Sequence, residues 1–413
     1  MGALRVLIVA PSLDGTDIGE VEWAFKWTEA LSRRAEVTVL ATSRIGFPPL
    51  AAQLPKARVV TWPEPAFLYQ KLERFNAMAK PALPLFAHQV RRWIRVAQAQ
   101  GEQFDIAHQI LPQAMRHATP LRGMGIPYVV GPIGGGLDTP EAFRDEVSDS
   151  ASLASQLRAI DRFRHRYDPW LRQGYAGANL ILGVAPYVVE RLVEVGLGQV
   201  PFQAILERGH GNVEPEILRQ DVVGRLRILH VGRSVRTKGL RDTIRAMADL
   251  RDLSEITLVS VGGGEDLENC QAEANRLGVA DRVTFLGQIP RADVEGEYAR
   301  ADAFCFPSFR EPMGGVLFEA MAHGLPIITA ARGGPDAIID DTCGIRVPVS
   351  TPDCFAHAIA GAVRRLALNP LLRLEMGRNA RTRLLSFGSW EDRADDVMAA
   401  YRHILEDRGV SLA

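Results

Sequence analysis

Cysteine, metal-ligand motifs and long apolar runs are scarce in this sequence. The chain of 413 residues has four cysteines, all in its second half, and no two of them form a Cys-x-x-Cys pair. That spacing offers no structural metal site, and unpaired thiols are typical of a reducing cytoplasm. No charge-free apolar run reaches the roughly 18 residues that a membrane-spanning helix requires. The sequence therefore predicts a cytoplasmic protein with no metal centre and no disulfide framework.

The sequence also has almost no net charge and no complete dinucleotide-binding fingerprint. The formal net charge is −1, so no overall field attracts nucleic acid or an anionic membrane. The apolar stretch at 4–10 is short and contains Arg5, which is typical of a first strand rather than a signal peptide. The loop after it lacks the full Gly-x-Gly-x-x-Gly pattern, and this disfavours a nicotinamide cofactor.

What the chain does contain is a regular alternation of short strands and helices. In the first half we expect strands at 4–10, 36–41, 58–62, 104–110, 127–131 and 179–184. In the second half we expect strands at 226–232, 255–261, 283–287, 303–307, 326–330 and 344–348. Helical stretches such as 19–33, 84–99 and 186–195 lie between them. This alternation predicts an α/β fold with two parallel, doubly wound, Rossmann-like sheets.

The chain is too long for one hydrophobic core, so two domains are expected. We predict a first domain over residues 1–200, a linker over 201–223 and a second domain over 224–388. The tail, residues 389–413, contains an amphipathic stretch that begins at Ser389.

One segment of the second domain is especially informative. An expected strand ends near residue 307, and a loop with Glu311, Gly314 and Gly315 leads into a helix with Glu319. The two glutamates are eight residues apart (319 − 311 = 8), so both can face one ligand. The glycines allow close approach of the backbone, and the first N–H groups of the helix favour an anion. A nucleotide sugar fits this arrangement; solvated glutamates in an ordinary strand-loop-helix unit are the alternative.

A second motif, residues 230–239, follows the first strand of the second domain. Arg233 and Lys238 would bracket a diphosphate near the start of a helix, where charge-assisted hydrogen bonds are strong. Arg236 is a further cation in the same loop. The alternative is an exposed basic loop. The glycine-rich stretch 262–264 after the next strand is, by itself, typical of a tight turn.

Together these segments resemble retaining glycosyltransferases of the GT-B fold, in particular glycosyltransferase family 4 (group 1). The family motifs read Gly-Arg-x-x-x-x-Lys-Gly, and Glu-Gly-Phe-Gly followed after four residues by Glu-Ala-Met-Ala-x-Gly-x-Pro. The sequence matches the first motif at Gly232, Arg233, Lys238 and Gly239. It matches the second over 319–326, whereas Pro312 and Met313 replace the usual Gly-Phe.

This resemblance implies a hexosyltransferase that moves a sugar from a nucleoside diphosphate sugar to an acceptor hydroxyl with retention, in the biosynthesis of a glycan, a glycolipid or a glycosylated metabolite. It implies no cofactor, no metal and no enzymic nucleophile. The implied catalytic residues are His108, Arg233, Lys238 and Glu311. The implied donor-binding residues are Gly232, Arg233, Lys238, Gly263, Ile289, Glu311, Met313, Gly314, Gly315, Val316, Leu317 and Glu319. The C-terminal helix is expected to cross back to the first domain.

The first domain is expected to face the acceptor. A glycine-bearing loop with Gly15 and Gly19 follows the first strand, at the edge of a parallel sheet where ligands bind. The strand at 104–110 contains His108, which the resemblance places beside the sugar. Gly134 and Gly135 belong to a glycine run that would expose backbone N–H groups. The alternatives are plain connecting loops and a structural histidine.

A basic and aromatic cluster lies near residue 165. It comprises Arg158, Arg162, Phe163, Arg164, His165, Arg166, Tyr167 and Trp170. A solvated helix face is the favoured interpretation; an anionic or lipid-linked acceptor, or peripheral docking at the inner membrane face, is the alternative. Two other functions remain open for the whole chain: a nucleotide-sugar-binding protein without turnover, and a GT-B isomerase or phosphorylase.

Overall fold

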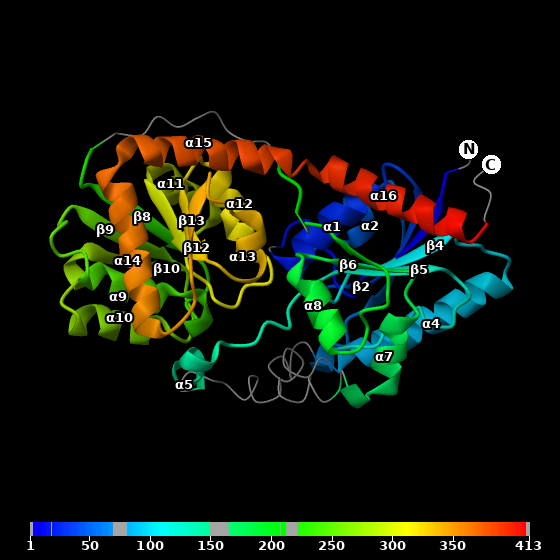
Figure 1. Ribbon diagram of the computed structural model, residues 1–413. Helices are drawn as coiled ribbons and strands as arrows, with labels where there is room; N and C mark the ends of the chain where they lie inside the picture. Colours follow the sequence, from blue (N-terminus) through cyan, green and yellow to red (C-terminus); the bar gives the residue numbers. More distant parts are fainter. Residues whose placement is uncertain are drawn as a thin grey trace. The chain divides into compact units, whose positions relative to one another are not determined.

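The computed structural model describes residues 3–17, 19–68, 81–148, 164, 166–206, 208–211 and 222–409. The chain divides into two compact units. Unit 1 comprises Met1–Gly136, Leu153–Gly209 and Gly388–Ala413, and unit 2 comprises Leu137–Ser152 and His210–Phe387. Each unit is a parallel β-sheet covered by helices, as Figure 1 shows. This architecture confirms the predicted α/β class.

The sheet of unit 1 has seven strands in the order β3-β2-β1-β4-β5-β6-β7. The strands are β1 (Arg5–Val9), β2 (Glu36–Ser43), β3 (Arg58–Pro63), β4 (Ile106–Gln109), β5 (Tyr128–Ile133), β6 (Leu180–Gly183) and β7 (Phe202–Ala204). The described helices are α1 (Glu20–Leu31), α2 (Leu50–Gln53), α4 (Ala82–Ala99), α7 (Pro169–Ala176), α8 (Tyr187–Glu194) and α16 (Trp390–Asp407).

The hydrophobic core of unit 1 contains residues from both the N-terminal and the C-terminal parts of the chain. Helices α1 and α16 lie side by side over one face of the sheet (Figure 1). Trp23 and Trp27 of α1 and Tyr401 of α16 belong to one buried cluster with Val6 and Ile8 of β1. Burial of several large apolar side chains, each stabilising by about 1.5–3 kcal/mol, therefore holds the C-terminal helix in unit 1.

The sheet of unit 2 has six strands in the order β10-β9-β8-β11-β12-β13. The strands are β8 (Leu226–Val231), β9 (Ile256–Val261), β10 (Val283–Gly287), β11 (Ala303–Phe306), β12 (Ile327–Ala330) and β13 (Gly344–Val347). The α-helices are α5 (Arg144–Ser148), α9 (Leu240–Ala248), α10 (Leu267–Arg276), α11 (Arg291–Arg300), α12 (Gly315–Ala322), α13 (Gly333–Ile338), α14 (Pro352–Leu368) and α15 (Pro370–Ser386). Short 3-10 helices lie at η2 (Glu141–Phe143), η3 (Arg236–Lys238) and η4 (Ala280–Arg282).

Helices α9 and α14 cover one face of the unit 2 sheet. Ile244 of α9 and Ile359 of α14 lie in a buried cluster with Ile228 and Leu258 of the sheet. Phe143, from far upstream in the sequence, belongs to the same cluster.

The predicted strands are confirmed, each within a few residues of its expected bounds. Two findings differ from the predicted domain bounds. Strand β7 lies within the expected linker 201–223, and it pairs with β6 as the seventh strand of unit 1. The segment Leu137–Ser152, expected in the first domain, belongs to unit 2. The predicted C-terminal helix is confirmed as α16, whose N-cap residue Ser389 forms a complete capping box with Asp392.

Among the described residues, no helix is both long enough and apolar enough to span a bilayer. Of the basic and aromatic cluster, Arg158, Arg162, Phe163 and His165 lie outside the described residues. Arg164 pairs with Asp168 at 3.2 Å, and the side chain of Trp170 is exposed.

Candidate functional site

The two predicted motifs meet at one edge of the unit 2 sheet. Strands β8 and β11 are parallel neighbours, so the loops that follow them leave the sheet at the same, carboxyl-terminal edge. The Nζ of Lys238, from the first loop, donates a hydrogen bond to the Glu311 carboxylate of the second. Both side chains are mostly buried, with 17% and 12% of their surface exposed. The structure thus brings together the predicted cation and the predicted carboxylate.

Gly239 allows the two loops to approach each other. Its φ is 78°, and a Cβ atom there would lie 2.3 Å from the carbonyl oxygen of Pro307, a separation that no side chain tolerates. The hydroxyl of Ser308 donates to the carbonyl of Thr237 at 3.0 Å. Only glycine fits at position 239, because the backbones of the two loops are in direct contact there.

The glycine-rich stretch at 262–264 has a similar role. A Cβ atom on Gly262 would lie 2.0 Å from the carbonyl oxygen of Gly232. The amide of Ser234 donates to the carbonyl of Gly263 at 2.9 Å, while a Cβ atom on Gly263 would meet nothing within 4 Å. The expected tight turn therefore also packs directly against the backbone of the first loop and leaves no space for a side chain at Gly262.

The three cations of the first loop lie in different environments. Arg233 is exposed, whereas Lys238 is mostly buried. Arg236 is buried, and its guanidinium donates to both carboxylate oxygens of Asp242 at 2.6 and 2.9 Å. The alternative interpretation of the segment as an exposed basic loop is therefore wrong for Arg236, which lies inside unit 2.

Helix α12 begins at the second loop. Gly314 precedes it with φ 93°. The side chains of Met313 and Leu317 are buried, so only their backbone groups can reach a ligand. The Leu317 amide already donates to the Gly314 carbonyl at 2.9 Å. Gly315 and Val316 are partly exposed at the start of the helix, where unsatisfied N–H groups favour an anion.

Glu319 is held from the neighbouring helix α11. The hydroxyl of Tyr298, whose side chain is fully buried, donates to the Glu319 carboxylate at 3.0 Å. Sequence reasoning missed Tyr298, because nothing in its spacing relates it to the glutamate motif. Ile289 lies partly buried in the turn between β10 and α11.

In unit 1, the loop after β1 is held by its own side chains. The amide of Gly15 donates to Gln53 at 2.9 Å, and both the amide and the hydroxyl of Thr16 donate to Asp14. Gly19 has φ 73° and directly precedes α1. These contacts explain the loop's conformation without a ligand.

His108 occupies the interior of unit 1 rather than its surface. Its ring is fully buried, and Nε2 donates to the carbonyl of Gly131 at 2.7 Å while Nδ1 accepts from the Tyr401 hydroxyl at 2.6 Å. Burial lowers the pKa of His108 to about 4, which keeps the ring neutral near pH 7. Because both nitrogens are engaged, this geometry argues against the predicted contact with a sugar.

The glycine run is also engaged internally. The amide of Gly134 donates to the Gln113 carbonyl at 3.1 Å, and the amide of Gly135 donates to the Tyr187 hydroxyl at 3.1 Å. In this conformation neither amide is presented for an acceptor. Over the described residues, no group of three or more His, Cys, Asp or Glu side chains is arranged to hold a metal ion.

Comparison with known proteins gives a match in the second half of the chain. Residues 219–383 match the family described as Glycosyl transferases group 1. A D-inositol 3-phosphate glycosyltransferase of Kribbella flavida is 36% identical over 162 residues, which cover 38% of this chain and 37% of the relative. The Streptomyces coelicolor protein of that name is 31% identical over 281 residues, which cover 64% of this chain and 59% of the relative.

A likeness to a solved structure extends over both units. The crystal structure of Anabaena HepE in complex with UDP and glucose covers 96% of this chain and 99% of its own, with a TM-score of 0.63 at 17% identity. At that identity the likeness shows the fold alone, and it is the GT-B fold. Residues 219–383 are therefore similar to the group 1 glycosyl transferases, and the chain as a whole has the GT-B fold.

Proposed function

We propose that this protein transfers a sugar from a nucleoside diphosphate sugar to an acceptor hydroxyl, with retention at the anomeric carbon. The observation that carries the proposal is the Lys238–Glu311 pair at the carboxyl edge of the unit 2 sheet. It joins a cation suited to a phosphate and a carboxylate suited to sugar hydroxyls, next to the start of α12. The family match over 219–383 lies in the same half of the chain, and HepE was solved with UDP and glucose.

Lys238 and Glu311 neutralise each other in the absence of a donor. When a donor diphosphate binds, Lys238 and the exposed Arg233 would lie against its phosphates, and Glu311 would accept hydrogen bonds from the sugar. Negative charge grows on the diphosphate as the bond from the anomeric carbon to the phosphate oxygen breaks, so fixed cations lower the barrier. Two cations and the start of a helix would serve without a metal ion.

Without an enzymic nucleophile, retention requires that the acceptor attack the face from which the diphosphate leaves. The acceptor oxygen forms the new bond to the anomeric carbon, and its proton passes to an oxygen of the departing phosphate. No residue of the chain needs to act as a nucleophile. Glu319, held by Tyr298, would accept hydrogen bonds from the ribose hydroxyls.

A panel of UDP-, GDP- and ADP-sugars, assayed for release of free nucleoside diphosphate, tests the proposal. Wild-type protein should release nucleotide from one donor class, and Lys238→Ala should raise the barrier by about 2–4 kcal/mol, the scale of one lost preorganised charge. Arg251→Ala is the matched control, because Arg251 is an exposed cation that donates to the Leu277 carbonyl in the same unit. A loss of less than about threefold for Lys238→Ala, below 1 kcal/mol, would contradict the assignment. Tight nucleotide binding without release would favour the non-catalytic binding protein.

A further inference from the structure

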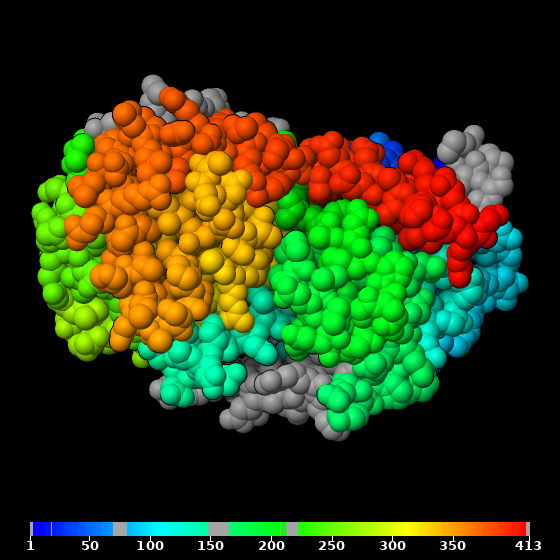
Figure 2. Space-filling model, in the orientation of Figure 1, coloured from blue at the N-terminus to red at the C-terminus, as the bar shows by residue number. Residues whose placement is uncertain are grey.

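A segment from outside the predicted donor domain completes unit 2. Residues 137–148 directly follow the glycine run in the sequence and contain η2 and α5. Figure 2 shows this segment at the surface of unit 2 beside α14. Its Phe143 is fully buried, with its ring centroid 4.5 Å from that of Phe309 and 5.8 Å from that of Phe355 in α14. The segment therefore contributes to the core of the unit.

The same segment encloses Arg236 of the first loop. The Nε of Arg236 donates to the Glu146 carboxylate at 2.6 Å, in addition to its two bonds to Asp242. The Arg236 Cζ atom lies 5.4 Å from the ring centroid of Phe143 and 5.3 Å from that of Phe309. The Arg236 side chain is only 1% exposed. Residues of 137–148 thus supply one hydrogen bond and one aromatic face to a buried cation.

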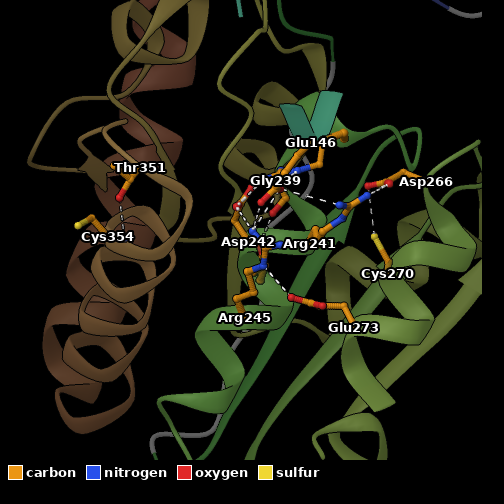
Figure 3. Close-up of polar contacts among 12 residues, drawn as sticks. Glu146, Gly239, Arg241, Asp242, Arg245, Asp266, Cys270, Glu273, Thr351 and Cys354 are labelled. Atoms are coloured by element: carbon orange, nitrogen blue, oxygen red, sulfur yellow. Dashed lines mark hydrogen bonds and ion pairs between the residues drawn. The ribbon is translucent and has the colours of Figure 1, made fainter. Parts of the chain in front are cut away.

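Glu146 also balances the charge of a larger cluster, of which Figure 3 labels Glu146, Arg241, Asp242, Arg245, Asp266 and Glu273. It accepts hydrogen bonds from Arg245 of α9 at 3.0 and 3.2 Å. Ion pairs connect four arginines and four carboxylates: Arg236, Arg241, Arg245, Arg276, Glu146, Asp242, Asp266 and Glu273. These eight sum to zero charge (4 − 4 = 0) and to +1 without Glu146. Burial raises the pKa of Glu146, but Arg236 and Arg245 outweigh it and hold that pKa below its ordinary value.

Arg236 connects this cluster to the residues proposed to bind the donor. It lies in η3 two residues before Lys238, and Phe309, which contacts it, lies two residues before Glu311. Side chains buried in a dense interior have little freedom to shift. Anchoring Arg236 therefore restrains the backbone on which Lys238 is carried, and the Phe309 contact extends that restraint to the Glu311 loop.

We propose that Glu146 and Phe143 are positioning residues for the diphosphate-binding loop, acting through Arg236. This inference rests on the proposed function, because it takes residues 232–239 as the loop that binds the donor phosphates. Neither residue reaches the reacting atoms; each holds the loop in the conformation that binds a diphosphate. Preorganisation of this kind contributes to affinity because the loop loses less freedom on binding.

Nucleotide affinity of the full-length chain tests the role of Glu146. Calorimetry would compare UDP and GDP with uridine and guanosine, for wild type, Glu146→Gln and the control Glu141→Gln. Glu141 lies on the same segment with its side chain 91% exposed. We expect Glu146→Gln to weaken diphosphate binding about tenfold, the scale of one lost hydrogen bond to a charged group, and to leave nucleoside binding unchanged. Equal affinity of Glu146→Gln and wild type for the diphosphate, or an equal loss for nucleoside and diphosphate, would overturn the proposal.

Hydrogen exchange without any nucleotide separates this inference from the proposed function. Amides of residues 233–239 should exchange faster in Glu146→Gln than in wild type or Glu141→Gln, and unchanged exchange would overturn the positioning role. If wild-type protein bound no nucleoside diphosphate but the loop still exchanged faster in the variant, the proposed function would fail and the restraint on the loop would stand. If Glu146→Gln does not fold, Phe143→Leu, which retains an apolar side chain, is measured in the same two ways.

Discussion

His108 should make the stability of unit 1 depend on pH. Burial lowers the pKa of the folded-state ring to about 4, against an ordinary value of 6.5. The difference of about 2.5 units (6.5 − 4) corresponds to about 3 kcal/mol at 1.36 kcal/mol per unit. Between pH 4 and 6.5 the unfolded state binds more protons than the folded state, so the free energy of unfolding rises with pH. This contribution is fully present above about pH 6.5 and is lost as the pH falls to 4.

The variant His108→Gln tests this reasoning. Its amide nitrogen can replace Nε2 as the donor to Gly131, and it has no proton to gain in this range. All six tryptophans, Trp23, Trp27, Trp62, Trp93, Trp170 and Trp390, lie in unit 1, so tryptophan fluorescence during denaturant unfolding reports that unit. Between pH 7.5 and 4, wild type should lose about 3 kcal/mol more than the variant.

The control for this experiment is His403→Gln, which replaces an exposed histidine of α16. It should follow wild type at every pH. If wild type and His108→Gln lost the same free energy of unfolding between pH 7.5 and 4, His108 would not be a buried neutral group, and the argument from its two hydrogen bonds would be refuted.

Three other predictions concern unit 2. Gly239→Ala should lower the free energy of unfolding of unit 2 by about 1–3 kcal/mol or more, because φ is 78° and the Pro307 backbone occupies the space of a Cβ atom. Calorimetric unfolding measures this loss, and Gly263→Ala, where a Cβ atom meets nothing within 4 Å, is the control that should be tolerated. Glu319→Ala should mainly weaken binding of the nucleoside diphosphate, whereas Glu311→Ala should mainly lower turnover; a larger loss of nucleotide affinity for Glu311→Ala would reverse these roles. Activity should survive EDTA, and complete loss restored by magnesium or manganese would contradict a metal-independent diphosphate site.

Much of the fold was predictable because strand signals are local. Short runs rich in Val and Ile between turn residues predicted the strands, and Ser389 was predicted at the start of the C-terminal helix, where it is the N-cap residue of α16. Strand β7 was missed, because Phe202–Ala204 has only three residues and weak apolar character. Its pairing with β6, rather than its own sequence, makes it a strand.

The sequence predicted some features of the candidate site and not others. Lys238 and Glu311 were identified from motif spacing, and they are in contact. Arg236 belongs to the same motif segment, yet it is buried against Asp242 and Glu146. His108 was predicted to lie beside the transferred sugar, but its ring is hydrogen-bonded to Gly131 and Tyr401. Motif spacing predicts which residues share a loop at the end of a strand. It does not predict which of their side chains are buried inside the domain and which can face a ligand.

The sequence by itself determined the strands of the two parallel sheets and the glycine-bearing loops that follow them, since each depends on neighbours within a short stretch of chain. Only the tertiary structure decided that residues 137–148 belong to unit 2 and that Tyr298 holds Glu319. The physical reason is that burial and charge pairing act between residues brought together by folding. Glu146 and Arg236, 90 residues apart in the chain, share a buried hydrogen bond that no local pattern encodes.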